Sequence, residues 1–273
     1  MKNTTKSFGV RMALVLIVLV AAVPALAQVN PQTINLPLSR PGEPISLEID
    51  ILSARIEVIG EDRDDVEFQI SVEDNERKIV TPSGTQSLSG GGYTVEVDER
   101  DNQISLDTDW RENKVTVVAR IPNRADLSLS TVNNGEIIVS NVNGNLELEN
   151  TNGPITATGI SGSAVAESIN DTIDIGFVAI DDVNVTSLES VNGELILRLP
   201  ANAGAQVHLD SSRGEMFSDF EVDVQPTQPT VERDERRGGV EVRIESVIVA
   251  NINGGGPVIR LKTLHGDINI RKQ

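Results

Sequence analysis

Carboxylates are the most abundant reactive side chains in this 273-residue chain, which contains 41 Asp and Glu residues. Two acids held on one face of a β-structure can cleave a glycosidic bond as acid and base or nucleophile. The acids at positions expected to face outward are Glu136, Glu147, Asp174, Glu194 and Asp267. They are spread along the chain without concentration. We therefore interpret them as solvated carboxylates and expect a non-enzymatic protein.

Few other residues are candidates for chemistry. His208 is expected to point outward from a strand and His265 to lie in a bend, and two histidines without nearby carboxylates do not make a facial metal site. Ser211–Ser212 lacks the context of an activated nucleophile. Asp181–Asp182 lacks the spacing of a calcium loop. No catalytic, cofactor-binding or metal-binding residue is assigned.

Sugar binding by ring stacking would need exposed aromatic side chains, but aromatics are only 3% of the chain. Trp110, between two charged residues, is the one expected platform. A hydrophobic cap at one end of the fold is the preferred interpretation of the same residue.

The elements that would position such groups are marked by turns at nearly fixed spacing. The turn anchors are Gly135, Gly144, Gly153, Gly162, Asp171, Asp181 and Gly193, with Gly266 in a last unit. The first four intervals are nine residues each. Asn precedes most anchors, and because Asn and Gly tolerate positive φ, we expect a tight bend at each.

Apolar residues recur two and four places after each anchor, which predicts short strands with one inward face. The first column is Ile137, Leu146, Ile155, Ala164, Ile173, Val183 and Leu195. The second is Val139, Leu148, Ala157, Ala166, Ile175, Val185 and Leu197. A third column, seven places after the anchors, is Val142, Thr151, Ile160, Ile169, Val178 and Leu188.

The third column decides between two all-β folds. Asn-Gly pairs favour hairpins, but a hairpin meander would keep its strand parity, and the step from four to seven breaks it. The pattern therefore predicts a single elongated β-solenoid of short rungs, with either two or three nine-residue units per turn. Asn side chains at equivalent bends are expected to form a hydrogen-bond ladder.

Residues 1–27 have the features of a cleaved secretory signal peptide. Lys2, Lys6 and Arg11 precede an apolar run at 12–23 that is short for a spanning helix, and Ala25-Leu26-Ala27 is a small-residue cleavage site. The rival interpretation is an uncleaved membrane anchor. We expect export to the periplasm, the cell surface or the medium, without a transmembrane segment in the mature chain.

The mature chain is expected to be one domain with two parts. Residues 28–125 are an irregular N-terminal β region, and 126–273 form the repeat. The repeat is interrupted by a Pro-containing, charged stretch at 221–239 that is predicted to be a mobile loop.

Charge and cysteine content exclude several classes of partner and site. The formal charge is −18 and becomes −21 when the three basic residues of the signal segment are removed, so nucleic acid and anionic lipid would be repelled. The chain has no cysteine, which excludes disulfides and thiolate metal sites.

Three stretches carry a family resemblance: Thr131-Val-Asn-Asn-Gly-Glu-Ile137, Ser190-Val-Asn-Gly-Glu-Leu195 and Gly255-Gly-Pro-Val-Ile-Arg-Leu-Lys-Thr-Leu-His-Gly-Asp-Ile268. Together they resemble the bacterial putative-adhesin family of envelope β-repeat proteins, over 40–273 and most strongly over 126–273. Asp171, Ser161 and His265 depart from the family's usual Gly or Asn. The resemblance implies an exported β-solenoid and carries over no catalytic residue.

The sequence therefore predicts an adhesion or interaction scaffold at a bacterial envelope, whose partner is an envelope protein or polysaccharide. A periplasmic stress or signalling accessory is the alternative, and a carbohydrate-active enzyme is a third hypothesis.

Overall fold

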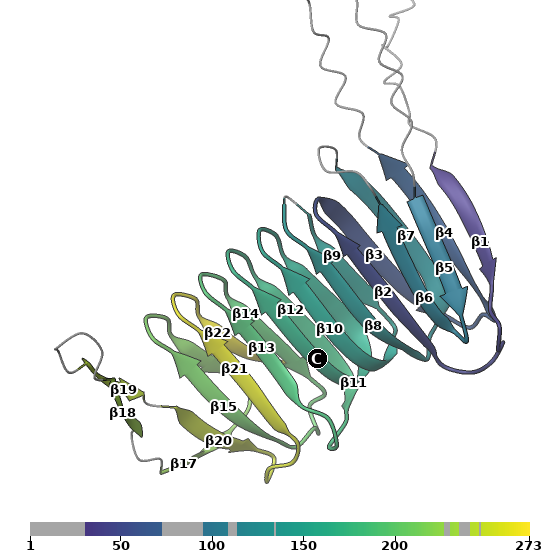
Figure 1. Ribbon diagram of the computed structural model, residues 1–273. Helices are drawn as coiled ribbons and strands as arrows, with labels where there is room; N and C mark the ends of the chain where they lie inside the picture. The colour runs from purple at the N-terminus through teal and green to yellow at the C-terminus, as the bar shows by residue number, and fades with distance from the viewer. Residues whose placement is uncertain are drawn as a thin grey trace, which may run out of the picture.

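The computed structural model describes residues 31–72, 95–108, 114–133, 135–226, 230–234, 241–245 and 247–273. Within these ranges the regular structure is entirely β, which confirms the predicted all-β class (Figure 1). No helix in the described ranges is long and apolar enough to cross a membrane. The predicted signal peptide at 1–27, Tyr93 and Trp110 lie outside the described residues.

Most strands lie in two rows of parallel neighbours. The first row, in spatial order, is β2 (Ile45–Ile51), β8 (Ala125–Thr131), β10 (Asn143–Asn150), the second part of β11 (Ile155–Ser168), β13 (Thr186–Ser190), β21 (Val258–Thr263) and β15 (Ala205–Ser211). The second row is β3 (Ala54–Glu61), β9 (Ile137–Ser140), the first part of β11, β12 (Ile173–Ile180), β14 (Leu195–Leu199), β22 (Ile268–Lys272) and β16 (Met216–Ser218).

The two rows belong to one 20-stranded sheet because β11 contributes to both. Residues 155–158 pair with β9, and 161–168 pair with β10. Between them the pairing shifts at a bulge, and Gly159 has a φ of +69°. The sheet thus turns back on itself, and its inward side chains form one apolar core.

The chain returns to the same row after two nine-residue units. Ile137 pairs with Ile155 and Ile155 with Ile173, and these partners are 18 positions apart. The number of units per circuit, which the sequence leaves open, is therefore two in this region. Residues at equivalent positions of successive circuits therefore lie side by side. Along most strands, successive residues alternate between buried and outward positions.

The first two apolar columns are buried except at one unit. Val183 and Val185 are 82% and 53% exposed. This circuit is longer, since Val165 pairs with Ser187, 22 positions on, and the extra residues form a loop before β13 begins at Thr186. The prediction of an inward position was therefore wrong for these two valines.

The third column was also wrong in part. Val142, Ile160 and Leu188 are buried, but Ile169 and Val178 are exposed. Alternate anchors lie at opposite corners of the circuit, so a residue seven places later does not return to an equivalent position. In β12 the inward place goes to Phe177, which pairs with Ile160.

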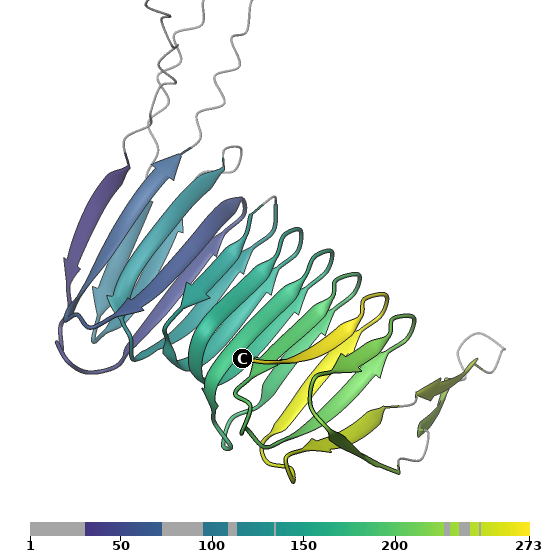
Figure 2. The ribbon, with the colours of Figure 1, turned by 180° about the vertical axis from the view of Figure 1, so that it is seen from behind.

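The order of strands in space differs from their order in the chain at both ends. At the N-terminal end, β6 (Gln103–Thr108) and β7 (Val115–Pro122) pair with β2 and β3, which places 45–61 between them and β8–β9. At the C-terminal end, β21 and β22 lie between β13–β14 and β15–β16, as the yellow strands show (Figures 1 and 2).

Antiparallel strands lie at each end of the stack of parallel strands. They are β1 (Gln32–Pro37), β4 (Asp65–Val72) and β5 (Val95–Arg100) at one end, and β17 (Val222–Gln225) and β20 (Ile248–Ile252) at the other. The hairpin of β18 (Thr230–Asp234) and β19 (Glu241–Glu245) forms a separate sheet. The stretch 221–239, predicted as a loop, thus contains β17 and β18.

Candidate interaction face

Small polar side chains end the strands of the first row. In three of them the hydroxyl accepts the N–H of a glycine three residues later: Ser190 from Gly193 at 2.8 Å, Ser211 from Gly214 at 2.9 Å, and Thr263 from Gly266 at 3.1 Å. The members of this corner ladder in register are Thr131, Asn150, Ser168, Ser190, Thr263 and Ser211. Sequence reasoning missed this ladder, although the Ser/Thr/Asn-x-x-Gly spacing was a usable signal.

The anchor glycines are needed for close packing more than for their φ angles. Among the described anchors, positive φ occurs only at Gly162, so the other anchors do not use the left-handed conformation that glycine permits. A Cβ on Gly153 would overlap the carbonyl oxygen of Gly135, and one on Gly193 would overlap that of Asp171. Backbones of successive circuits therefore approach closely at these corners.

The anchors fall into two corners. The corner that follows the first row holds Gly135, Gly153, Asp171, Gly193 and Gly266, and the opposite corner holds Gly144, Gly162 and Asp181. Outside the first of these corners, Asn170 donates to Asn152 at 2.7 Å, and Asn192 donates to Asn170 at 2.9 Å. The predicted asparagine ladder is confirmed for these three residues.

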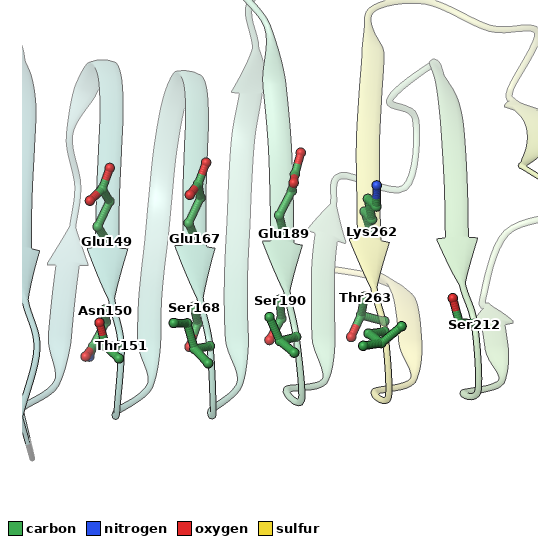
Figure 3. Close-up of a pocket in the computed structure, with 13 residues that line it drawn as sticks. Glu149, Asn150, Thr151, Glu167, Ser168, Glu189, Ser190, Ser212, Lys262 and Thr263 are labelled. Atoms are coloured by element: carbon green, nitrogen blue, oxygen red, sulfur yellow. The ribbon is translucent and has the colours of Figure 1, made fainter. Parts of the chain in front are cut away.

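The corner ladder holds an outward row of charges in place on the first row. Glu149 lies in register with Glu167, Glu167 with Glu189, and Glu189 with Lys262. We call these four residues the charged row, and Figure 3 shows them side by side on successive strands. Neighbouring strands are about 4.8 Å apart, so the carboxylates on them repel one another electrostatically. The expectation that acids are not concentrated was therefore wrong here.

The electrostatic consequence appears at the middle of the charged row. The pKa of Glu167 is raised from its ordinary value, first because partial desolvation disfavours its charged form. Like charges add to the shift, and they come from Glu189, Glu149 and Glu147. A cationic group placed over this row would relieve the repulsion.

An aliphatic row runs beside the charged row. Ile169, Val191 and Leu264 lie two positions after Glu167, Glu189 and Lys262, one residue past the ends of β11, β13 and β21, and are 45%, 39% and 44% exposed. Together the two rows line a groove of about 490 Å³, which Thr151 and Ser212 also line. None of the described residues that line this groove is aromatic.

Most acids named from the sequence are held by structural partners instead. Asp174 accepts two hydrogen bonds from Arg198, both at 2.8 Å, and Glu194 accepts one from Asn269 at 2.6 Å. Glu136 forms an ion pair with Arg55. Asp267 accepts a backbone N–H, and Glu147 is exposed on β10, two residues before Glu149.

The remaining candidates also have structural contacts. His208 faces outward, 3.2 Å from Gln206, and His265 lies in an exposed bend, as expected. Ser211 donates to Gly266, and Asp181 accepts from Asn184. In the part of the chain that the structure describes, no group of His, Asp and Glu could hold a metal ion.

Comparisons with known proteins give distant likenesses to solved structures. No family model and no curated protein matches the chain. A putative cell adhesion protein from Clostridium sporogenes is 12% identical with a TM-score of 0.46, over 89% of this chain and 100% of its own. A putative adhesin from Bacteroides fragilis is 12% identical with a TM-score of 0.35, over 89% and 97%. One from Parabacteroides merdae is 10% identical with a TM-score of 0.29, over 89% and 96%.

Proposed function

We propose that this protein is an exported β-solenoid that acts as a non-enzymatic interaction scaffold at the bacterial cell envelope. The parallel circuits of two units each support the solenoid, because each circuit repeats the same path one strand further along. The apolar segment and small-residue site at 1–27 support export. The family resemblance of the motifs supports the adhesion role.

The charged row and the face around it are the proposed contact surface. The observation that carries this proposal is the in-register placement of Glu149, Glu167 and Glu189. Within the described residues, neither Glu149 nor Glu167 has a cationic side chain in register beside it, whereas Glu189 has Lys262. Structural ion pairs neutralise acids elsewhere, such as Asp174 with Arg198. Exposed like charges that a fold holds together favour a partner of opposite charge, both in affinity and in association rate.

The outward rows continue beyond the groove. Glu149 is in register with Ser130 and Ser130 with Asp50, while Asp210 follows Lys262 at the other end. A partner therefore meets repeated polar and charged side chains at a spacing of about 4.8 Å. Binding by such a surface comes from many weak contacts rather than from one deep pocket.

Reversal of the charged row tests this function. We expect Glu149→Lys, Glu167→Lys and Glu189→Lys together to reduce binding of the purified protein to isolated cell envelopes at least about tenfold. The matched control carries Asp62→Lys, Asp64→Lys and Glu221→Lys, which are exposed and give the same net charge. If the two triple variants bind alike while both melt as the original protein does, the charged row is not the contact surface.

A further inference from the structure

The groove on the first row combines two chemistries in parallel lines. Carboxylates of Glu149, Glu167 and Glu189 form one line, and Ile169 and Val191 lie in the other. Residues two apart in a chain are at most about 7 Å apart, so the backbone positions of the two lines lie within about that distance of each other. The carboxylate line crosses successive strands of the first row (Figure 3). The aliphatic residues follow these carboxylates by two positions in the chain and line the same groove.

This arrangement narrows the chemistry of an occupant. The exposed aliphatic side chains require an apolar stripe on the ligand, and the adjacent carboxylates require a cationic one. The described lining has no aromatic ring for a sugar to stack on, and a polyanion would meet three carboxylates. A ligand with a basic stripe beside an apolar stripe fits both lines.

Spacing distinguishes the conformation of such a ligand. Along the groove, equivalent side chains recur every 4.8 Å or about that distance, which is the strand separation. An α-helix presents one stripe with a pitch of about 5.4 Å, whereas an extended chain repeats on one face every 6.7 Å or so. Over the four strands of the groove, the helix stays within about 2 Å of register and the extended chain does not.

We propose that this groove binds an amphipathic α-helical segment of a partner protein, with a basic stripe over the carboxylates and an apolar stripe over Ile169, Val191 and Leu264. The proposal rests on the scaffold function proposed above and names the partner of that face. Lys262 ends the acidic line, so the occupant is expected to be basic over its first three turns and acidic or neutral at the fourth. This asymmetry gives the bound helix one direction.

Synthetic helices test the proposal without knowledge of the natural partner. The probe is a fluorescent peptide of about 18 residues with a lysine stripe beside a leucine stripe, titrated against the full mature protein by anisotropy. One control peptide keeps the composition in scrambled order, and a second keeps the lysine stripe but has serine for leucine. We expect the probe to bind about tenfold more tightly than either control, since only the probe matches both lines.

Variants of the aliphatic row separate this inference from the proposed function. Ile169→Ser, Val191→Ser and Leu264→Ser together should abolish the preference for the probe over the serine peptide. The matched control carries Val178→Ser, Val222→Ser and Val224→Ser, which change exposed valines outside the groove. This control should still bind the probe more tightly than the serine peptide. All variants are first checked for an unchanged melting temperature.

Equal binding of the probe and both control peptides, or a preference that survives the aliphatic triple variant, overturns the helix proposal. If the reversed charged row still weakens envelope binding in that case, the scaffold function stands and only the identity of the occupant fails. If charge reversal has no effect on envelopes either, the proposed function fails as well.

Discussion

The corners of the stack depend on two residue types acting together. A small polar side chain such as Ser190 accepts the N–H of Gly193, and that glycine lets the backbone of the next circuit come close. Both features repeat at successive corners, so a defect at one corner affects the packing of two circuits. The Asn152–Asn170–Asn192 ladder ties the same corners together on their outer side.

Gly153→Ala tests the close approach. The new Cβ would overlap the carbonyl oxygen of Gly135, and we expect the free energy of unfolding to fall by about 1–3 kcal/mol in denaturant titration. The control is Gly176→Ala, where the nearest atom is the flexible amide end of Gln273 at 2.9 Å and φ is not positive. It should change stability by less than about 1 kcal/mol. Equal effects would contradict the packing explanation.

Glu167→Gln tests the crowding of charge in the charged row. The pKa of Glu167 in the folded chain is raised above its ordinary value near 4.5, so the folded chain binds the carboxyl proton more tightly than the unfolded chain does. The stability of the protein therefore falls as pH rises from the unfolded pKa through the folded pKa of Glu167. The variant should therefore melt higher than the original protein at pH 7, and the difference should shrink below about pH 4.5. Glu221→Gln, outside the row, is the control. A difference that does not depend on pH would contradict this explanation.

Strands with the same local pattern occupy quite different places in the stack. Val258–Thr263 alternates between buried and exposed residues much as Ala125–Thr131 does, yet β21 lies between β13 and β15, out of chain order. The pattern predicts that each segment is a strand with one inward face. The pattern cannot predict which strands will pair with each segment, because every circuit offers the same backbone hydrogen-bonding groups at its edge.

Truncation after Gly256 tests this order. Loss of 257–273 removes β21 and β22, which lie between β13–β14 and β15–β16. The strands on both sides then lose their hydrogen-bond partners and their packing against buried residues of β21 such as Ile259 and Leu261. We expect loss of cooperative unfolding in the whole C-terminal part, seen by hydrogen exchange over 186–220. The control removes 28–37, which includes β1, at the outer edge of the sheet. If the amides of 186–220 are as well protected from hydrogen exchange in the truncated chain as in the full chain, the strand order is wrong.

The candidate site shows a similar limit of the sequence. Glu149, Glu167 and Glu189 are each visible as outward strand residues, but they become neighbours only when two units make one circuit. The interval from Glu167 to Glu189 also includes the longer loop before β13, which a regular nine-residue pattern does not contain. Their concentration is thus a property of the stack and not of any one unit.

The whole molecule presents two different outer faces on one core. The first row carries the charged row and the aliphatic row, whereas acids on the second row are often neutralised, as Asp174 is by Arg198. With a formal charge of −18, the protein as a whole favours basic partners, and the fold concentrates that preference on one side. We therefore expect the contact with the partner to be limited to the first row.

The chain has no cysteine, so a single introduced thiol can report which face meets the partner. We would place a photo-crosslinker on Ser212→Cys, which lines the groove, and on Thr158→Cys, which is exposed on the second row, and irradiate each protein bound to isolated envelopes. We expect crosslinked partner protein from Ser212→Cys and at most a small fraction of that yield from Thr158→Cys. Equal yields, or a larger yield from Thr158→Cys, would contradict the claim that the first row is the interaction face.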